Sequence, residues 1–202
     1  MMQPDRHQKF AFRSPAEVQD AARELGVDLP FSRRLELLAA PLPVAGRMAP
    51  NRFMIQPMEG FDADAGGTPG ALAFRRYRRY AAGGAGLIWF EATAIAPEAR
   101  SNPHQFWLHP GNVAEFARLT AETRAAARQA FGHEVLLLLQ LTHSGRYSRP
   151  AGTPAPILAH HSPVLDALQK IAPDAPVVED GYLETLPAKF AAAARLAEQA
   201  GF

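Results

Sequence analysis

Cysteine is missing from the 202 residues of this chain. Its absence excludes disulfides, a thiolate nucleophile and any cysteine-ligated metal or iron–sulfur cluster within these residues. Net charge is nearly absent too, because 21 Lys and Arg residues stand against 20 Asp and Glu residues. The resulting formal charge of +1 gives no electrostatic reason to expect a nucleic acid or an anionic membrane as a partner.

Long apolar runs and a secretory signal are also missing. The apolar run Val135–Leu139 is far shorter than the ~20 residues that span a bilayer, and the polar residues 1–10 lack the apolar core of a signal peptide. We therefore expect a soluble, cytoplasmic protein. Proline, in contrast, is abundant at 18 residues. Six of these prolines lie between residues 140 and 179, which predicts one long loop there.

The chain changes its pattern near residue 42, which predicts a leader over 1–41 and a second domain over 42–202. In the leader, Ser14-Pro15 is typical of a helix start and Gly26 of a helix end, so we expect a helix over Ser14–Leu25. In the second domain, strands and helices alternate. The predicted strands are Asn51–Gln56, Leu87–Phe90 and Val135–Leu139, and the predicted helices begin at Thr68-Pro69, at the capping box Asn112-x-x-Glu115 and near Pro187.

Strands that are apolar on both faces and alternate with helices indicate a parallel α/β sheet covered by helices. The open doubly wound sheet and the (β/α)₈ barrel both fit this pattern. No Gly-x-Gly-x-x-Gly follows the first strand, which weakens the dinucleotide-binding form of the open sheet. Glu59, Glu91 and Gln140 follow the strands, where barrel enzymes place their chemistry. The last helix ends at Gly201 where a strand should begin, so we expect a barrel truncated to about its first three βα units.

Three segments carry a resemblance to a known family. They are Asn51-Arg52-Phe53 with Gln56–Glu59, Tyr77–Thr93 (YRRYAAGGAGLIWFEAT) and Gln140–Arg146 (QLTHSGR). In order and spacing, residues 42–202 resemble the N-terminal portion of the old yellow enzyme family, whose members are FMN-binding TIM barrels. The resemblance implies an NAD(P)H:flavin oxidoreductase of the ene or dienoyl reductase type, with FMN as cofactor and NAD(P)H as reductant. It also implies that hydride passes to an activated C=C bond of a small molecule such as an enone.

The resemblance further implies which residues contact the flavin, and we call this set the cofactor wall: Gln56, Pro57, Met58, Glu59, Ala92 and Gln140. Gln140 would bind the flavin pyrimidine, because one amide supplies both a donor and an acceptor. Ala92 is small enough for the ring to come close. From the residues alone, a polar end to an apolar strand is the favoured interpretation of Gln140. Pro57-Met58 is as readily an ordinary turn.

Glu59 departs from the family, in which many members carry a threonine or cysteine that faces the flavin O4 region. An ionised glutamate accepts hydrogen bonds but donates none, and it would oppose the negative charge of a reduced flavin. Glu59 either turns away from the flavin toward an arginine or is protonated through burial. We expect the first, because Arg100 and Arg146 should lie on the same face of the barrel. Phe61 is a candidate substrate contact, although a phenylalanine in such a loop also commonly packs on the next helix.

No catalytic residue and no metal site is assigned. The family's substrate-anchoring pair, proton donor and phosphate site correspond to sequence beyond residue 202. His143 lies in the third motif without the spacing of a metal site. Four arginines on the helix after Pro69 are expected to form a solvated face: Arg75, Arg76, Arg78 and Arg79.

Two other functions remain open from the residues. One is a non-catalytic half-barrel that self-associates or binds a partner, and the other is a (β/α)₈ enzyme that binds a phosphorylated substrate and no flavin. The oligomeric state is not predicted. For a fragment of a barrel, we expect the inward face, including Ile55, Ile88 and Leu137, to be partly open.

Overall fold

The computed structural model describes residues 10–202. It separates into two compact units that meet between Leu35 and Glu36. In the first unit, helix α1 spans Pro15–Glu24, and the Ser14 hydroxyl accepts a hydrogen bond from the Glu17 amide at 3.3 Å. The predicted helix start is therefore confirmed, whereas the division of the chain at residue 41 stays a prediction. Within residues 10–202, no helix has the length and hydropathy that a membrane span requires.

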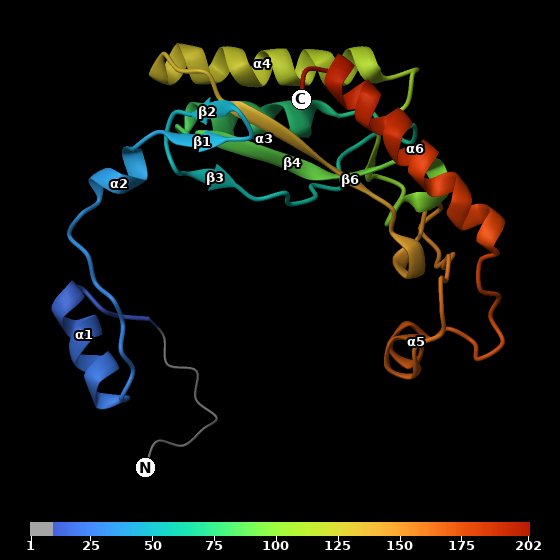
Figure 1. The fold of residues 1–202 in the computed structure, drawn as a ribbon, viewed down its shortest axis with the longest axis horizontal. Coiled ribbons are helices and arrows are strands. Elements are labelled where there is room, and N and C mark those ends of the chain that lie inside the picture. Colours follow the sequence, from blue (N-terminus) through green and yellow to red (C-terminus); the bar gives the residue numbers. More distant parts are fainter. Residues whose placement is uncertain (1–9) are drawn as a thin grey trace. The chain divides into compact units, whose positions relative to one another are not determined.

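The second unit alternates strands and helices, as expected (Figure 1). Its elements are α2 (Glu36–Ala39), β1 (Leu42–Val44), β2 (Arg47–Ala49), β3 (Met54–Ile55), α3 (Ala71–Ala82), β4 (Leu87–Ala94), β5 (Phe106–Trp107), α4 (Val113–Phe131), β6 (Leu136–Thr142), α5 (Pro163–Gln169) and α6 (Asp180–Gln199). Short 3₁₀ turns follow β4 at Pro97–Ala99 and β6 at Gly145–Tyr147. The sequence analysis does not predict the hairpin β1–β2, the short strand β5 or helix α5. Helix α5 nevertheless begins with Ser162-Pro163, the same kind of start as Ser14-Pro15 in α1.

Strand β4 lies at the centre of a parallel sheet. Strand β6 pairs with it along its whole length on one side, while β3 and β5 pair with its two ends on the other side. Strands β3, β4 and β6 are the three that the sequence predicts, and all three run in the same direction. Their carboxyl ends therefore lie at one edge of the sheet, where a parallel α/β fold binds ligands.

Helices α3 and α4 cover one face of this sheet, and α6 lies against α4 and β6 (Figure 1). The Tyr77 ring of α3 stacks on Phe90 of β4 with centroids 3.8 Å apart. Ile88 and Leu137 lie in the same core and are 0% and 5% exposed. The expectation that these two residues line the inward face is therefore wrong.

The face that lacks helices carries the alternate side chains of the same strands. Met54 and Leu138 lie on it and are 42% and 41% exposed. Side chains alternate between the two faces of a strand, so the burial of Leu137 on the helix side places Leu138 on the other. The uniformly apolar run Val135–Leu139 gives no sign of which residues face which way.

The three predicted helix starts of the second unit also differ in the structure. Helix α3 begins at Ala71 with Gly70 at its N-cap, so Thr68-Pro69 does not open it. Helix α6 begins at Asp180 and contains Pro187 in its interior, so that proline does not open it. Asn112 precedes α4 but makes no side-chain cap, because its side chain bonds the preceding loop through the His109 amide (3.0 Å) and the Trp107 carbonyl (2.9 Å). The predicted end of α4 is confirmed, since Gly132 adopts the left-handed conformation at φ +68°.

Candidate functional site

An irregularity in β4 decides which of its residues face the side of the sheet without helices. The pairing of β4 with β6 shifts between Phe90 and Ala92, so that Glu91 is an extra residue opposite no partner of its own. Beyond this bulge, Ala92 pairs with Gln140. Gln140 shares its face with Leu138, two residues earlier, so Ala92 lies on that face as well. The structure therefore brings two residues of the cofactor wall together in one row.

Gln140 is half-buried near the carboxyl end of β6. The side-chain amide of Gln140 makes no hydrogen bond to any residue within 10–202. A half-buried amide with an unused donor and an unused acceptor suits a ligand that offers both kinds of group. The neighbouring Ala92 is 8% exposed and adds no bulk beside it.

The remaining members of the cofactor wall lie in the loop that follows β3, at the same edge of the sheet. Gln56 and Met58 are exposed, Met58 to 70%, and a turn joins them through the Met58 amide and the Gln56 carbonyl at 3.0 Å. Pro57 is half-buried. Phe61, the candidate substrate contact, does not pack on α3, because its ring is 58% exposed.

Glu59 does not turn toward an arginine, so that expectation is wrong. Its carboxylate accepts hydrogen bonds from the Ser101 hydroxyl at 3.1 Å and from the Gln105 amide at 3.4 Å. Arg100 instead donates to the backbone carbonyl of Ala65. Burial raises the pKa of Glu59, and the negative charge of the nearby Glu91 raises it further. Glu59 is thus a carboxyl without a cation at the edge of the sheet.

Gln105 is a site residue that sequence reasoning missed. It is 1% exposed, and its amide donates both to Glu59 and to the Ala92 carbonyl, the latter at 3.2 Å. Its own carbonyl accepts from the Ser101 amide at 2.6 Å. Gln105 therefore joins the loop after β3 to the end of β4. It stands in an aperiodic polar stretch, so no spacing in the sequence indicates this role.

Glu91 is the most buried charged residue of the described chain, at 0% exposure. It accepts hydrogen bonds from the Gly60 amide at 2.7 Å and from the Tyr77 hydroxyl at 3.0 Å, and it pairs with Arg76. Burial raises the pKa of Glu91, although the bonds from Gly60 and Arg76 oppose the rise. Arg76 also pairs with Asp62. It is therefore not part of the solvated arginine face to which the sequence assigned it, whereas Arg75, Arg78 and Arg79 are exposed.

A second polar cluster joins the end of β6 to α6. His143 Nε2 lies 2.7 Å from the Tyr182 hydroxyl, and Lys189 Nζ donates to Glu98 at 2.6 Å. Burial lowers the pKa of His143. These contacts tie α6 to the two segments that follow β4 and β6.

A third cluster holds the proline-rich loop. Arg146 pairs with the buried Asp166 of α5, and Asp166 also accepts from the Ser162 amide at 3.1 Å. His161 Nδ1 lies 2.8 Å from the same carboxylate. Arg146 thus anchors α5 and does not approach Glu59.

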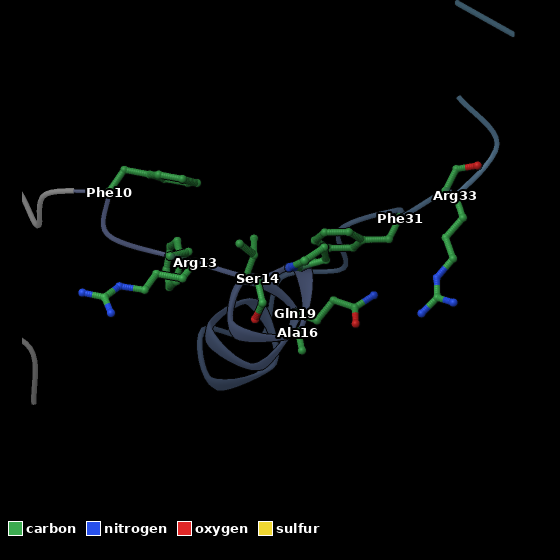
Figure 2. A pocket seen from close by; sticks show the side chains of 11 residues that line it. Phe10, Arg13, Ser14, Ala16, Gln19, Phe31 and Arg33 are labelled. Carbon is green, nitrogen blue, oxygen red and sulfur yellow. The ribbon is translucent and has the colours of Figure 1, made fainter. Parts of the chain in front are cut away.

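A hollow of about 780 Å³ lies in the first unit. Figure 2 shows the side chains around it, which come from α1 and from the segments before and after that helix. Phe10 is 80% exposed and meets Phe12 edge to face at 5.0 Å. Its charged residues, Arg13 and Arg33, are exposed, so this hollow lacks the buried polar groups that the sheet edge provides.

Comparisons of sequence and of structure with known proteins point to the same family. No protein-family profile matches the chain. An NADPH dehydrogenase of Halalkalibacterium halodurans is 30% identical over 160 residues, which are 79% of this chain and 44% of that protein. The chain therefore spans less than half the length of this curated relative.

Solved structures have the same fold over about four fifths of this chain. An old yellow enzyme homologue from Zymomonas mobilis matches with a TM-score of 0.66 at 24% identity, over 82% of this chain and 46% of that one. Morphinone reductase in complex with tetrahydroNAD matches with a TM-score of 0.65 at 23% identity, over 82% and 47%. A 2-naphthoyl-CoA reductase matches with a TM-score of 0.68 at 16% identity, over 83% and 26%. The predicted barrel class is confirmed by these matches: in sequence and in fold, the chain is similar to the N-terminal portion of the old yellow enzyme family.

Proposed function

We propose that the protein is an FMN-dependent NAD(P)H oxidoreductase that reduces an activated C=C bond, and that this chain supplies part of its flavin site. The observation that carries the proposal is the unpartnered amide of Gln140, which is in register with Ala92 at the edge where the loop after β3 also lies. The similarity to an NADPH dehydrogenase supports the same reaction class.

The residues present fit an isoalloxazine ring. The edge of that ring offers carbonyl acceptors and an N–H donor, and the single amide of Gln140 can satisfy one of each. Ala92 presents one methyl group beside it, which permits close approach of a flat ring. The exposed Gln56 and Met58 and the half-buried Pro57 would border the same ring.

When bound, FMN supplies the hydride relay from a nicotinamide to a carbon–carbon double bond. The chain's own residues position the ring and set the charge around it. Gln140 would orient the pyrimidine edge, and Glu59 would place a carboxyl near the ring without a compensating cation. Phe61, with an exposed ring in the same loop, would contact an apolar part of the substrate.

The first prediction tests Gln140 directly. In the whole protein, Gln140→Leu should weaken FMN binding by about 1–3 kcal/mol, because the polar edge of the ring would lose its partner in a half-buried site. Titration with FMN, followed by the quenching of flavin fluorescence, measures the change. The matched control is Gln129→Leu on the exposed surface of α4. Equal affinities for the two variants would remove Gln140 from the cofactor wall.

The same titration separates the competing functions. An FMN-dependent enzyme should bind flavin and then oxidise NAD(P)H in the presence of an enone. A barrel for a phosphorylated substrate should bind no flavin, and a non-catalytic half-barrel should show neither flavin binding nor NAD(P)H oxidation.

A further inference from the structure

The loop after β3 is anchored at two neighbouring points. The Gly60 amide donates to a carboxylate oxygen of Glu91 at 2.7 Å. Two residues later, both oxygens of Asp62 accept from the Arg76 guanidinium. Arg76 in turn pairs with Glu91, so the two attachments form one unit. We call Glu91 and Arg76 the loop anchor.

The Glu91 half of the loop anchor is held on all sides, whereas the Arg76 side chain is 20% exposed. Glu91 is fully buried, and Tyr77 both donates to its carboxylate at 3.0 Å and accepts from its backbone amide at 2.9 Å. A Cβ atom at Gly60 would lie 2.1 Å from Arg76 Nη1. The guanidinium therefore lies directly against the loop backbone, and a side chain at position 60 would require the guanidinium to move.

Phe61 lies between the two anchored residues in an unusual backbone conformation. Its φ angle is +51°, in the left-handed region that bulky residues rarely adopt. Its ring gains no burial from this conformation, since it is 58% exposed. Backbone strain at an exposed side chain persists where the surroundings impose it, and such residues cluster at ligand sites. The anchors on both sides provide that constraint.

We propose that Glu91 and Arg76 are positioning residues that hold loop 56–62 in its ligand-facing conformation and thereby present the Phe61 ring to the bound ligand. The inference rests on the proposed function for the identity of the ligand, FMN and the flat, apolar substrate beside it. The loop geometry itself stands on the contacts above.

The variants Glu91→Gln and Arg76→Lys test the anchor. One carboxylate oxygen of Glu91 accepts from Gly60 and the other accepts from both Arg76 and Tyr77. A glutamine at position 91 replaces one of these oxygens by an NH₂ group, and the orientation that keeps two of the three bonds turns this group toward Gly60. A lysine at position 76 keeps the charge but cannot bridge two carboxylates with a fixed fork. The matched control is Arg78→Lys on the same helix, which loses only a surface pair with Glu122 at 3.5 Å.

Two measurements on the whole protein separate positioning from general stability. Hydrogen exchange by NMR should be about tenfold faster at the Gly60 amide in both anchor variants, while the amides of β6 keep their wild-type rates. FMN titration should give a Kd about fivefold or more above wild type in both variants. Arg78→Lys should change neither quantity.

Wild-type exchange at Gly60 in Glu91→Gln would overturn the inference. Hydrogen exchange that is accelerated equally at Gly60 and throughout β6 would also overturn it, because that pattern indicates that Glu91 and Arg76 have a purely structural role. A wild-type whole protein that binds no FMN would instead refute the proposed function, and the exchange rate at Gly60 would still decide whether Glu91 and Arg76 hold the loop.

Discussion

Glu59 and Glu91 are two carboxylates at one edge of the sheet, and their surroundings assign them different roles. Glu91 has a guanidinium partner, a phenol and a backbone amide, which satisfy a buried carboxylate. Glu59 accepts only from neutral groups, and burial raises its pKa. Glu91, with a cation beside it, holds the structure together. Glu59 has no such cation, so its charge is free to act on a bound ligand.

The replacement Glu59→Thr should raise the reduction potential of the bound flavin. An ionised Glu59 opposes the extra negative charge of the reduced ring, and threonine removes that repulsion while restoring a donor. We expect a rise of about 30 mV for each ~1.4 kcal/mol of repulsion removed, since the couple transfers two electrons. A redox titration of the flavin-loaded protein with a dye of known potential measures it.

The difference in flavin reduction potential between wild type and Glu59→Thr should decrease as the pH is lowered. Because the pKa of Glu59 is raised, lowering the pH protonates it earlier than an ordinary carboxyl. The gap in potential between wild type and Glu59→Thr should therefore be largest at neutral pH and shrink as the pH falls through the raised pKa. The exposed Glu134→Thr serves as control and should leave the potential unchanged. A gap that stays constant with pH would contradict an electrostatic cause.

At the scale of elements, the bulge in β4 carries the site. Without the extra residue at Glu91, strict alternation would turn Ala92 toward the helices and leave Gln140 beside a different neighbour. The bulge instead directs Phe90 and Glu91 together toward α3, where they meet Tyr77. The bulge thus places Glu91 among the helix side chains and also places Ala92 beside Gln140 on the open face.

Two glycines at helix ends should respond to alanine in opposite directions. Gly132 ends α4 at φ +68° with open space around its Cα, so Gly132→Ala should cost about 1–2 kcal/mol of backbone strain and nothing from clashes. Gly181 lies in the first turn of α6 with no positive φ and with open space as well. Gly181→Ala should add about 0.5–1 kcal/mol to the free energy of unfolding.

Urea unfolding monitored by circular dichroism measures both changes. Each variant is the other's control, since both add the same methyl group to a helix end without a nearby atom. Destabilisation by both variants would mean that steric contacts, and not backbone conformation, decide the outcome at these positions.

At the scale of the whole second unit, the sheet has one covered face and one open face. Helices α3 and α4 bury Ile88, Phe90 and Leu137 on the first (Figure 1). The second carries the exposed apolar side chains of Met54 and Leu138, and Leu138 lies two residues before Gln140. Exposed apolar surface of this kind favours association.

The replacement Leu138→Lys should therefore reduce self-association of the chain and its binding of the apolar dye ANS. The control is Leu72→Lys, which introduces the same charge on α3 at a leucine that is 59% exposed but lies outside the sheet. Sedimentation velocity and ANS fluorescence at matched protein concentrations measure the two effects. An equal reduction by both variants would show that added charge, and not the open face, is responsible.

Local rules account for what the sequence alone determined. Ser14 before Pro15 and Gly132 after α4 set helix ends, because capping and a left-handed backbone depend on neighbouring residues only. Alternating apolar strands and helices indicated a parallel sheet. Three motifs together, one of them around Gln140, indicated a resemblance to the family, and the strand register placed Gln140 beside Ala92.

Long-range contacts decided the rest. Glu59 bonds with Gln105, and Arg76 leaves its run of surface arginines to meet Glu91, in each case across segments that are distant in the chain. Leu138, and not Leu137, lies on the open face of the sheet. The sequence could not predict this, because a uniformly apolar run shows no alternation that indicates which side chains face inward. A sequence records which groups can bond or bury, whereas only the packed sheet determines which of them meet, since one inserted residue reverses the face of all that follow.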